Sequence, residues 1–360
     1  MKRFLCLMMT LVCLGALMMT SLAEPVVTLL KDEADRKIAV KGLTGDGSFP
    51  VNPEIAGQSP TTGLDWTGTY MPMLVQIDNH DGGLGHRAPW GAADADIIYE
   101  TPLHKTGDTR ISFLFSDTVP ESVGPVRSAR ITHAELREEW DAGFVFYGGQ
   151  EYEGTNINDT FKNTGAKDKG ILFSGLDGKA WKQYYSRVEN LKAPHNVDAN
   201  VKAIQALVPA DFKAPSRPFL FTDELPELGE LASTISIKLV KDAYSSSFSY
   251  DPNANVYYRF VNGQPYVEKT SGDQLSFSNL IIQRTKVTFR RSDSPITVNI
   301  GSGNADIFMG GRYIAGYWMR TGMDQRTVFF DENGNELMLQ RGKTFISMID
   351  YSTQVTYSAQ

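Results

Sequence analysis

The sequence predicts an α+β protein, in which a mixed α/β N-terminal domain is followed by a β-rich C-terminal domain. The chain has 360 residues, which corresponds to about two domains of ordinary size. In the first half, short apolar runs alternate with helical patterns, as they do in mixed α/β layers. In the second half, short apolar runs follow one another with hairpin turn signals between them, which is typical of antiparallel sheets.

The first 23 residues have the pattern of a secretion signal. Lys2 and Arg3 form a basic start, residues 4–19 are apolar, and Ser21-Leu22-Ala23 supplies the small residues of a cleavage site. The alternative is an uncleaved membrane anchor, but the apolar run is short for a span. We therefore expect an extracytoplasmic protein, secreted or associated with the cell envelope, with no transmembrane segment after cleavage.

Both cysteines, Cys6 and Cys13, lie inside this signal. The mature chain would therefore have no disulfide, thiol nucleophile or cysteine-held metal. Thr10-Leu11-Val12 lacks the small residue that lipid attachment at Cys13 needs, which favours cleavage after Ala23. Cleavage changes the net charge from −7 to −9, because 33 basic residues then face 42 acidic ones. With no basic patch, the sequence argues against nucleic acid and anionic membrane surfaces as partners.

The remaining chain divides into four segments. Residues 24–58 are polar and Gly-rich and read as a lead-in arm, ordered only in part. Residues 59–210 form the first domain, and residues 211–234 are a proline-marked linker. Residues 235–355 form the second domain.

In the first domain, apolar runs predict strands at residues 73–78, 97–100, 110–115 and 144–147. Residues 90–95 form a short helical or turn piece, and a helix follows Ser128 up to Asp141. Residues 151–178 are polar and are expected to form a loop. A short helix follows at residues 179–186, and another at residues 198–208 with Asp198 as its cap.

In the second domain, nine short strands are expected, at residues 236–239, 248–250, 256–261, 280–283, 296–300, 305–309, 313–319, 327–330 and 344–348. Hairpin signals separate several of them, at Asn262-Gly263, Gly310-Gly311 and Asn333-Gly334. We expect a twisted antiparallel sheet or small barrel, with Trp318 and Phe345 in its core.

The stretch Val123-Gly-Pro-Val-Arg-Ser-Ala-Arg130 organises the candidate site. Gly124-Pro125 ends the preceding strand, and Ser128 is a good N-cap for the helix that follows. One helical stripe then contains Ala129, Thr132, His133, Leu136 and Trp140, with Glu135, Arg137, Glu138 and Glu139 mostly outside it. A helix N-terminus flanked by Arg127 and Arg130 would suit a carboxylate or phosphate.

Two other interpretations of this stretch stay open. It is a capped helix with solvated arginines, or Ser128 is a nucleophile. The second alternative lacks support, because no Gly-x-Ser-x-Gly elbow surrounds Ser128.

Polar residues at a strand end form the second candidate group. Asp78, Asn79 and His80 follow the strand at residues 73–78, and Arg110 begins another strand. Strand ends place binding residues in α/β folds, although Asx side chains also stabilise turns there. Asp78 and Asp81 with His80 and His86 match no known metal spacing, so we expect no metal.

His195 and Asn196 precede the helix expected at residues 198–208. Two helix N-termini could therefore converge on one ligand, or they could be unrelated caps. Asp96 and Glu100 could in principle form a hydrolytic pair, but an extended strand holds them roughly 13 Å apart, too far for a glycosidase. The sequence has no phosphate loop, dinucleotide fingerprint or zinc-protease motif, so we expect no cofactor and find no independent case for an enzyme.

These residues resemble the "YerB-like putative lipoprotein" family of Gram-positive bacteria. The resemblance covers roughly residues 59–350 and rests in the first domain on Ser59-Pro-Thr-Thr-Gly-Leu64, Val75-Gln-Ile-Asp-Asn-His80, Ala95-Asp-Ile-Ile-Tyr-Glu100, Thr109-Arg110, Val123-Gly-Pro-Val-Arg-Ser-Ala-Arg130, Tyr147-Gly-Gly149 and Ala193-Pro-His-Asn196. In the second domain it rests on Gly301-Ser-Gly303, Gly310-Gly-Arg-Tyr-Ile-Ala-Gly-Tyr-Trp318, Phe330-Asp-Glu-Asn-Gly-Asn335 and Gly342-Lys-Thr-Phe345. It implies an extracytoplasmic two-domain protein without an established activity. This chain departs from the family pattern because it lacks a convincing lipid-attachment cysteine.

Three functional hypotheses follow. The first is a binding protein of the cell envelope, whose N-terminal domain holds an anionic or glycan-peptide ligand with Asp78, Asn79, His80, Arg110, Arg127, Ser128, Arg130, His195 and Asn196. The second is a scaffold or regulatory partner of envelope enzymes, and the third is a cell-wall hydrolase with His195 or Glu100 as acid/base. The sequence favours binding over catalysis.

Overall fold

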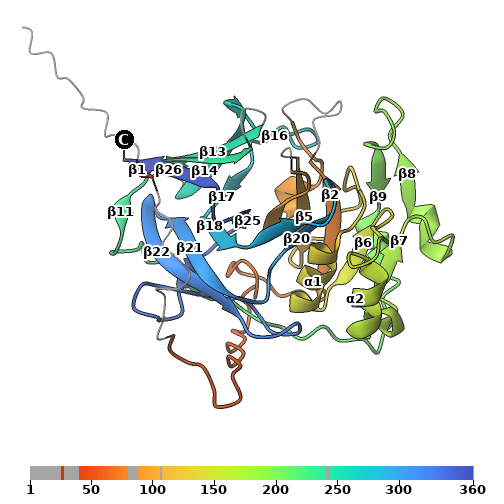
Figure 1. The fold of residues 1–360 in the computed structure, drawn as a ribbon, viewed down its shortest axis with the longest axis horizontal. Helices are drawn as coiled ribbons and strands as arrows, with labels where there is room; N and C mark the ends of the chain where they lie inside the picture. The colour runs from red at the N-terminus through yellow and green to blue at the C-terminus, as the bar shows by residue number, and fades with distance from the viewer. Residues whose placement is uncertain (1–25, 28–39, 80–86, 106–107, 241–243, 360) are drawn as a thin grey trace, which may run out of the picture.

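The structure is a computed structural model that describes residues 26–27, 40–79, 87–105, 108–240 and 244–359. The predicted secretion signal, both cysteines, His80 and His86 lie outside these residues. Strands from both halves of the chain form one long mixed sheet, with a second sheet and the helices against it (Figure 1). The expected α+β class is confirmed.

The long sheet contains eleven strands. Five come from the first half of the chain, namely β4 (Ile97–Pro102), β5 (Thr109–Phe115), β2 (Met73–Asp78), β6 (Gly143–Phe146) and β7 (Leu172–Ser174). Six come from the second half, namely β25 (Thr344–Asp350), β18 (Asn279–Thr285), β21 (Gly301–Met309), β22 (Arg312–Arg320), β11 (Glu230–Leu231) and β23 (Val328–Phe330). The two halves meet where β25 pairs in parallel with β4, with Thr344 beside Ile97 and Ser347 beside Glu100. The sheet therefore crosses the domain boundary that we predicted, and the boundary itself stays a prediction.

The second sheet has seven strands, all antiparallel. They are β1 (Val26–Val27), β26 (Gln354–Ser358), β12 (Thr234–Val240), β13 (Tyr244–Asp251), β14 (Val256–Val261), β15 (Gln264–Pro265) and β17 (Ser276–Phe277). Four strand pairs lie apart from both sheets: β10 (Leu220–Thr222) with β24 (Met338–Gln340), β16 (Val267–Glu268) with β3 (Arg87–Ala88), β19 (Val287–Phe289) with β20 (Pro295–Thr297), and β8 (Tyr185–Arg187) with β9 (Val197–Ala199).

The helices are short. They are α1 (Ile131–Trp140), α2 (Ile157–Asn163) and α3 (Val201–Gln205), with single 3-10 turns η2 (Ala92–Asp94), η3 (Ala166–Lys169) and η4 (Ala180–Tyr184). The helices differ from the sequence-based expectation in two regions of the chain. Residues 151–178 are not a loop, because they contain α2, η3 and β7. The last helix begins after Asn200, which caps it by accepting the N–H of Ala203, while Asp198 lies in β9 and accepts the indole N–H of Trp90.

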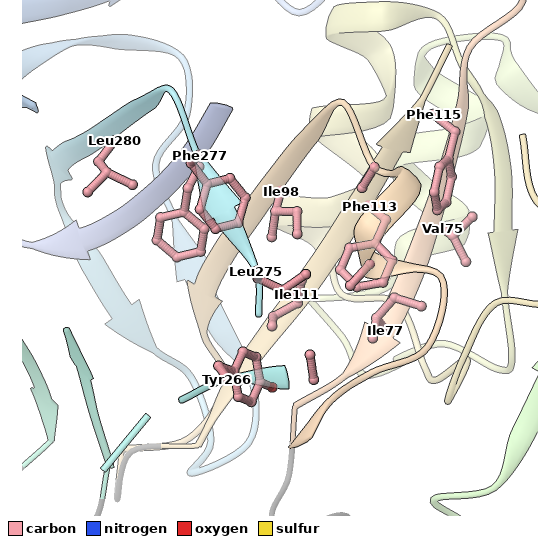
Figure 2. Packing of buried hydrophobic residues seen from close by; sticks show 14 of the residues in the cluster. Val75, Ile77, Ile98, Ile111, Phe113, Phe115, Tyr266, Leu275, Phe277 and Leu280 are labelled. Atoms are coloured by element: carbon pink, nitrogen blue, oxygen red, sulfur yellow. The ribbon is translucent and has the colours of Figure 1, made fainter. Parts of the chain in front are cut away.

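The long sheet lies between two hydrophobic cores, so its central strands are buried on both faces. In β2, Val75 and Ile77 face one core while Leu74 faces the other. Figure 2 shows the first core, in which Ile98 and Ile111 of the first half lie near Leu275 and Phe277 of the second. One core thus joins the two halves of the chain, which explains why apolar runs rather than alternating patterns mark these strands.

Several predicted strands are confirmed with the same or nearly the same bounds, including β2 and β14, and Trp318 and Phe345 are buried as expected. The prediction of one antiparallel sheet or barrel for the second half is wrong. Its strands are divided between two sheets, and β25 pairs in parallel with both β18 and β4. A parallel pairing needs partners that are distant along the chain, which local turn signals do not reveal.

The helix α1 begins later than the sequence predicted. Ser128 is not its cap, because residues 123–130 are extended and pair with neighbouring chain: the N–H of Arg127 donates to the carbonyl of Gln76, and that of Ala129 to Gly148. Arg130 is the N-cap residue, and its N–H donates to His133 Nδ1 at 2.9 Å. The N–H groups of Ala129 and Arg130, which directly follow Ser128, therefore already have acceptors in Gly148 and His133.

Charged residues of α1 that we placed outside the apolar stripe are buried. Arg137 is fully buried and pairs with Glu138 and with Asp141. The Glu139 carboxylate accepts the N–H of Thr327 at 2.7 Å and lies 3.8 Å from Arg320 of the second half. The prediction was wrong because the second half of the chain covers the outer face of this helix.

The described parts of the arm, residues 26–27 and 40–58, are attached to the second half of the chain, the first through the pairing of β1 with β26. Phe49 is buried against Val328 and Phe330. Arg326 donates to the carbonyl of Pro50 through Nε and Nη2. These contacts place the arm against β23.

Two neighbouring carboxylates, the buried Asp96 and the half-buried Asp117, lie where the arm enters the first domain. Asp96 Oδ2 accepts the N–H groups of Ser116 (2.5 Å) and Asp117 (3.1 Å). The neighbouring Asp117 carboxylate accepts the hydroxyls of Ser59 and Thr62, both at 2.6 Å. Burial, and then the negative charge of Asp117, raise the pKa of Asp96 to about 7.

This pair predicts a pH dependence of stability. Because the folded-state pKa of Asp96 exceeds its unfolded value of about 4, the group stabilises the fold below pH ~4 and loses that contribution as pH rises to about 7. Asp96→Asn keeps the side-chain shape without the charge. The difference in unfolding free energy between wild type and Asp96→Asn should change by on the order of a few kcal/mol across this range in urea titrations. The exposed Asp94→Asn is the control, and equal pH profiles for all three proteins would contradict the prediction.

Candidate functional site

The candidate site is built where β2 ends. Residues 123–130 run beside that strand, with Val126 bridged to Ile77, and β9 lies on their other side. In the antiparallel pair β2–β5, Arg110 lies directly opposite Asp78. Three distant parts of the chain are therefore brought to the last residue of one strand.

Asp78 is the centre of this arrangement. Its carboxylate is fully buried, with Arg110 Nη2 3.7 Å from Oδ1 and Arg127 Nε 3.6 Å from Oδ2. His195 Nδ1 contacts Oδ2 directly. Four of the predicted site residues thus converge, and we call Asp78, Arg110, Arg127 and His195 the Asp78 cluster.

The Asp78 cluster itself carries two guanidinium groups against one carboxylate. Around it, the positive charge of Arg130 acts on Arg110, while the negative charges of Asp108 and Asp293 act on Arg110 and Arg130 in turn. Burial is the largest effect on Arg110 and, with Arg130 and Arg127, lowers its pKa to about 9 despite the attraction of Asp78. Burial also lowers the pKa of Arg130. An added anion would relieve this imbalance.

The hydrogen-bonding capacity of the cluster is also incompletely used. Among the described residues, Arg110 Nε and Arg127 Nε have no hydrogen-bond acceptor, and Asp78 Oδ1 has no donor. Buried polar groups are normally satisfied, and an unmade bond to a charged group is costly. Both Nε atoms are themselves buried, and Arg127 Nε lies 3.6 Å from the Asp78 carboxylate, so the cluster is held by charge attraction rather than by complete hydrogen bonding.

A pocket of about 470 Å³ opens beside the cluster and includes Arg127 and Ser128 in its wall. We call it the Arg127 cleft. Four cationic side chains line it, against two acidic ones: Arg127, Lys167, Lys179 and Arg187 against Glu151 and Asp177. Its aromatic wall consists of Phe146, Tyr147, Phe161 and Trp181. The cleft is therefore cationic although the whole chain has a net charge of −7.

Two glycines shape this cleft. Gly148 has a positive φ of 76°, which lets the chain turn sharply after β6. At Gly149, an added Cβ would lie 1.9 Å from Ile157 Cδ1, so the close approach of α2 requires glycine. The Tyr147-Gly-Gly149 string thus forms one edge of the cleft.

Sequence reasoning missed most of the cleft. Lys167, Lys179 and Arg187 come from residues 151–187, which were read as a polar loop and a short helix. Isolated lysines in polar segments are usually solvated, so no pattern distinguished them. The one local signal was the aromatic content of residues 179–186, of which Trp181 lines the cleft.

The other predicted residues have separate roles. The Arg130 Nε donates to the carbonyl of Asp293 at 3.2 Å, so this side chain reaches the second half of the chain. Asn196 accepts from Arg187 Nη1 at 2.6 Å and donates to the carbonyl of Leu191, which makes it a turn residue. Ser128 lines the cleft, and its carbonyl lies 3.4 Å from Arg110 Nη1. His80 lies outside the described residues.

Neither alternative for the two helix N-termini, convergence on one ligand or unrelated caps, describes these residues. Arg127 lies in extended chain before α1, and His195 and Asn196 lead into β9 rather than a helix. The residues meet at the Asp78 carboxylate. Attraction between opposite charges at the end of β2, rather than a helix dipole, accounts for their position.

Asn79, the residue after Asp78, belongs to a second network that joins the two halves of the chain. Its Nδ2 donates to Thr109 Oγ1 (2.7 Å) and Glu100 Oε1 (3.1 Å), and its Oδ1 accepts the Tyr266 hydroxyl (2.9 Å). Glu100 accepts Arg259 Nη2 at 3.0 Å, and both side chains are fully buried. Glu100 is therefore engaged in a buried ion pair, which argues against it as a hydrolytic acid or base.

This ion pair gives a stability prediction. Removing one partner leaves the other charge buried without compensation, so Glu100→Leu and Arg259→Met should each cost about 3–5 kcal/mol of unfolding free energy. The double variant should recover most of that loss, because two apolar side chains replace the pair. Urea denaturation of all four proteins tests this coupling. Additive single and double effects would contradict it.

Comparison with known proteins identifies the family. Residues 61–213 match the N-terminal domain, and residues 235–346 the C-terminal domain, of a family described as "Protein of unknown function (DUF3048)". The chain belongs to the YerB-like two-domain family. It is 24% identical to "Putative lipoprotein YerB" of Bacillus subtilis (strain 168) over 284 residues, which cover 77% of this chain and 81% of that protein.

A solved structure shows the YerB-like fold. The crystal structure of the YerB protein from Bacillus subtilis matches with a TM-score of 0.67 and 24% identity, over 81% of this chain and 96% of that chain. The YerB-like family has no described activity, so its function has to be argued from the site. Within the described ranges, no helix has both the length and the apolar character needed to cross a bilayer. In the same ranges, no three His, Cys, Asp or Glu residues form a group that could hold a metal ion.

Proposed function

We propose that this protein binds an anionic ligand of the cell envelope, a carboxylate-bearing glycan-peptide, in the Arg127 cleft. The observation that carries the proposal is the position of Arg127. Its guanidinium belongs to the Asp78 cluster and also lines the cleft, with its side chain 22% exposed. A ligand in the cleft can therefore reach one member of a buried cluster that has surplus positive charge.

The cleft suits a ligand of mixed chemistry. Its cationic side chains would pair with carboxylates, and guanidinium groups bind such oxygens in bidentate geometry. The rings of Tyr147 and Trp181 offer apolar surface for a sugar ring or a peptide side chain. The volume of about 470 Å³ lies in the range of small-ligand pockets.

The envelope as the location is supported by two observations. The first residues have the pattern of a secretion signal. The relative from Bacillus subtilis is named as a putative lipoprotein. We propose an extracytoplasmic protein on this basis, with the mode of attachment left to experiment.

The proposal predicts the effect of losing Arg127. The first step is a thermal-shift screen of muropeptides, carboxylates and phosphate. A ligand at a concentration about 100 times its Kd adds about 2.7 kcal/mol to the free energy of unfolding, so a ligand that binds should raise Tm by a few degrees. Arg127→Ala should then raise Kd about 10- to 100-fold in calorimetry, because a charged hydrogen bond contributes about 1.5–3 kcal/mol. Arg127→Lys should recover part of the affinity, and higher salt should weaken binding.

Arg312→Ala is the matched control, because Arg312 lies on β22 and lines neither the cleft nor the cluster. Its affinity should equal that of the wild type. Equal affinity in Arg127→Ala would overturn the proposal. The scaffold alternative would be favoured if Arg127→Ala still captured an envelope protein as the wild type does and if no small ligand bound to either. Turnover of a cell-wall substrate that is lost in His195→Ala would favour the hydrolase alternative.

A further inference from the structure

A second pocket, of about 600 Å³, lies where the arm meets both halves of the chain. Its walls come from residues 53–58 of the arm, residues 59–60, 66–68 and 70 of the first domain, residues 216 and 218–221 of the linker, and Met338 on β24. We call it the junction pocket. Asn52 Nδ2 donates to the carbonyl of Pro218 at 3.0 Å, and the N–H of Phe219 to the carbonyl of Pro60 at 3.1 Å. These bonds join the linker to the arm and to the start of the first domain beside the pocket.

The chemistry of the junction pocket is opposite to that of the Arg127 cleft. Aromatic and aliphatic side chains dominate its wall, including Trp66, Phe219, Phe221 and Pro60. Glu54 is the one charged residue among those that the structure places in this wall. Among the described residues, no lysine or arginine lines it. The nearby Arg217, whose charge acts on Tyr70, donates to the carbonyls of Glu138 and Glu139. The two pockets share no lining residue.

Apolar side chains at this pocket are unusually exposed to solvent. Ile55 is 59% exposed and Met338 is 48% exposed, and both belong to the lining. An apolar cavity with exposed apolar residues at its boundary is typical of a binding site rather than of a packing defect. Contact with a hydrocarbon would remove this surface from water, and that burial is the driving force for binding.

The pocket wall also contains unused hydrogen-bonding groups. Tyr70 Oη and Ser216 Oγ are buried and have no hydrogen-bond partner among the described atoms. Burial raises the pKa of Tyr70 well above its usual value, so this phenol stays protonated and neutral. Both groups are hydroxyls, which donate to and accept from a neutral polar group.

We propose that the junction pocket binds a neutral amphiphile, a hydrocarbon chain that ends in a hydroxyl group. The apolar wall takes the chain, and the hydroxyl pairs with the unsatisfied hydroxyls of the wall. Glu54 in the wall, with no described lysine or arginine among the lining residues, disfavours the corresponding fatty acid by charge. This site is separate from the Arg127 cleft and does not depend on the function proposed for it.

Tryptophan fluorescence tests the proposal, because Trp66 lines the junction pocket and Trp181 lines the Arg127 cleft. Undecanol with a terminal bromine is the probe, since bromine quenches an indole that it contacts. We expect saturable quenching of the purified chain, lost for the most part in Trp66→Phe and retained in Trp181→Phe. The matching brominated undecanoate should have a Kd at least about ten times higher than that of the alcohol.

A second variant guards against a folding defect in Trp66→Phe. Ile55→Glu with Met338→Glu changes two exposed side chains and should raise the apparent Kd of the alcohol about tenfold. Leu228→Glu with Leu231→Glu is the matched control, because both leucines are similarly exposed and neither lines the pocket. It should bind as the wild type does.

Three outcomes would overturn the proposal. Quenching lost in Trp181→Phe instead of Trp66→Phe would place the amphiphile in the Arg127 cleft. Equal binding of alcohol and carboxylate would show that the pocket does not select a neutral head group. A dimer in sedimentation analysis that is broken by Ile55→Glu with Met338→Glu and unaffected by the alcohol would make a second copy of the chain the occupant.

Discussion

The parallel pairing of β25 with β4 is the interaction on which the architecture depends. It adds six strands from the second half of the chain to five from the first, and it buries both strands in the middle of one sheet. Phe345 on β25 lies against the guanidinium of Arg259, which in turn holds Glu100 on β4. The apolar core and this ion pair therefore lie on the same side of the junction. Both depend on the register in which β25 pairs with β4.

The candidate site depends on the same junction through two consecutive residues. Asp78 gathers Arg110, Arg127 and His195, while Asn79 is bound to Glu100 and Tyr266. The end of β2 is thus fixed both by the second half of the chain, through Asn79, and by the cationic residues around Asp78. Preorganisation of this kind lowers the entropic cost of binding, because the guanidinium groups need little rearrangement.

The protein has two pockets with different chemistry. The Arg127 cleft presents cations and aromatic rings, and the junction pocket presents apolar side chains and neutral hydroxyls. The arm forms a wall of the junction pocket and is held by Arg326 of the second half. Because the two pockets share no lining residue, the two ligands that we propose would not compete for the same side chains.

The sequence alone determined features that depend on neighbouring residues: the strands β2 and β14, the Asn262-Gly263 turn with its positive φ values, and the polar strand end that begins with Asp78. These follow from local sterics and from burial of apolar runs. Only the tertiary structure decided the β25–β4 pairing, the burial of Arg137 in α1, the start of that helix at Ile131, and the lysines of the cleft. Each of these depends on partners far along the chain, whose backbone donors and charges compete with local preferences and prevail.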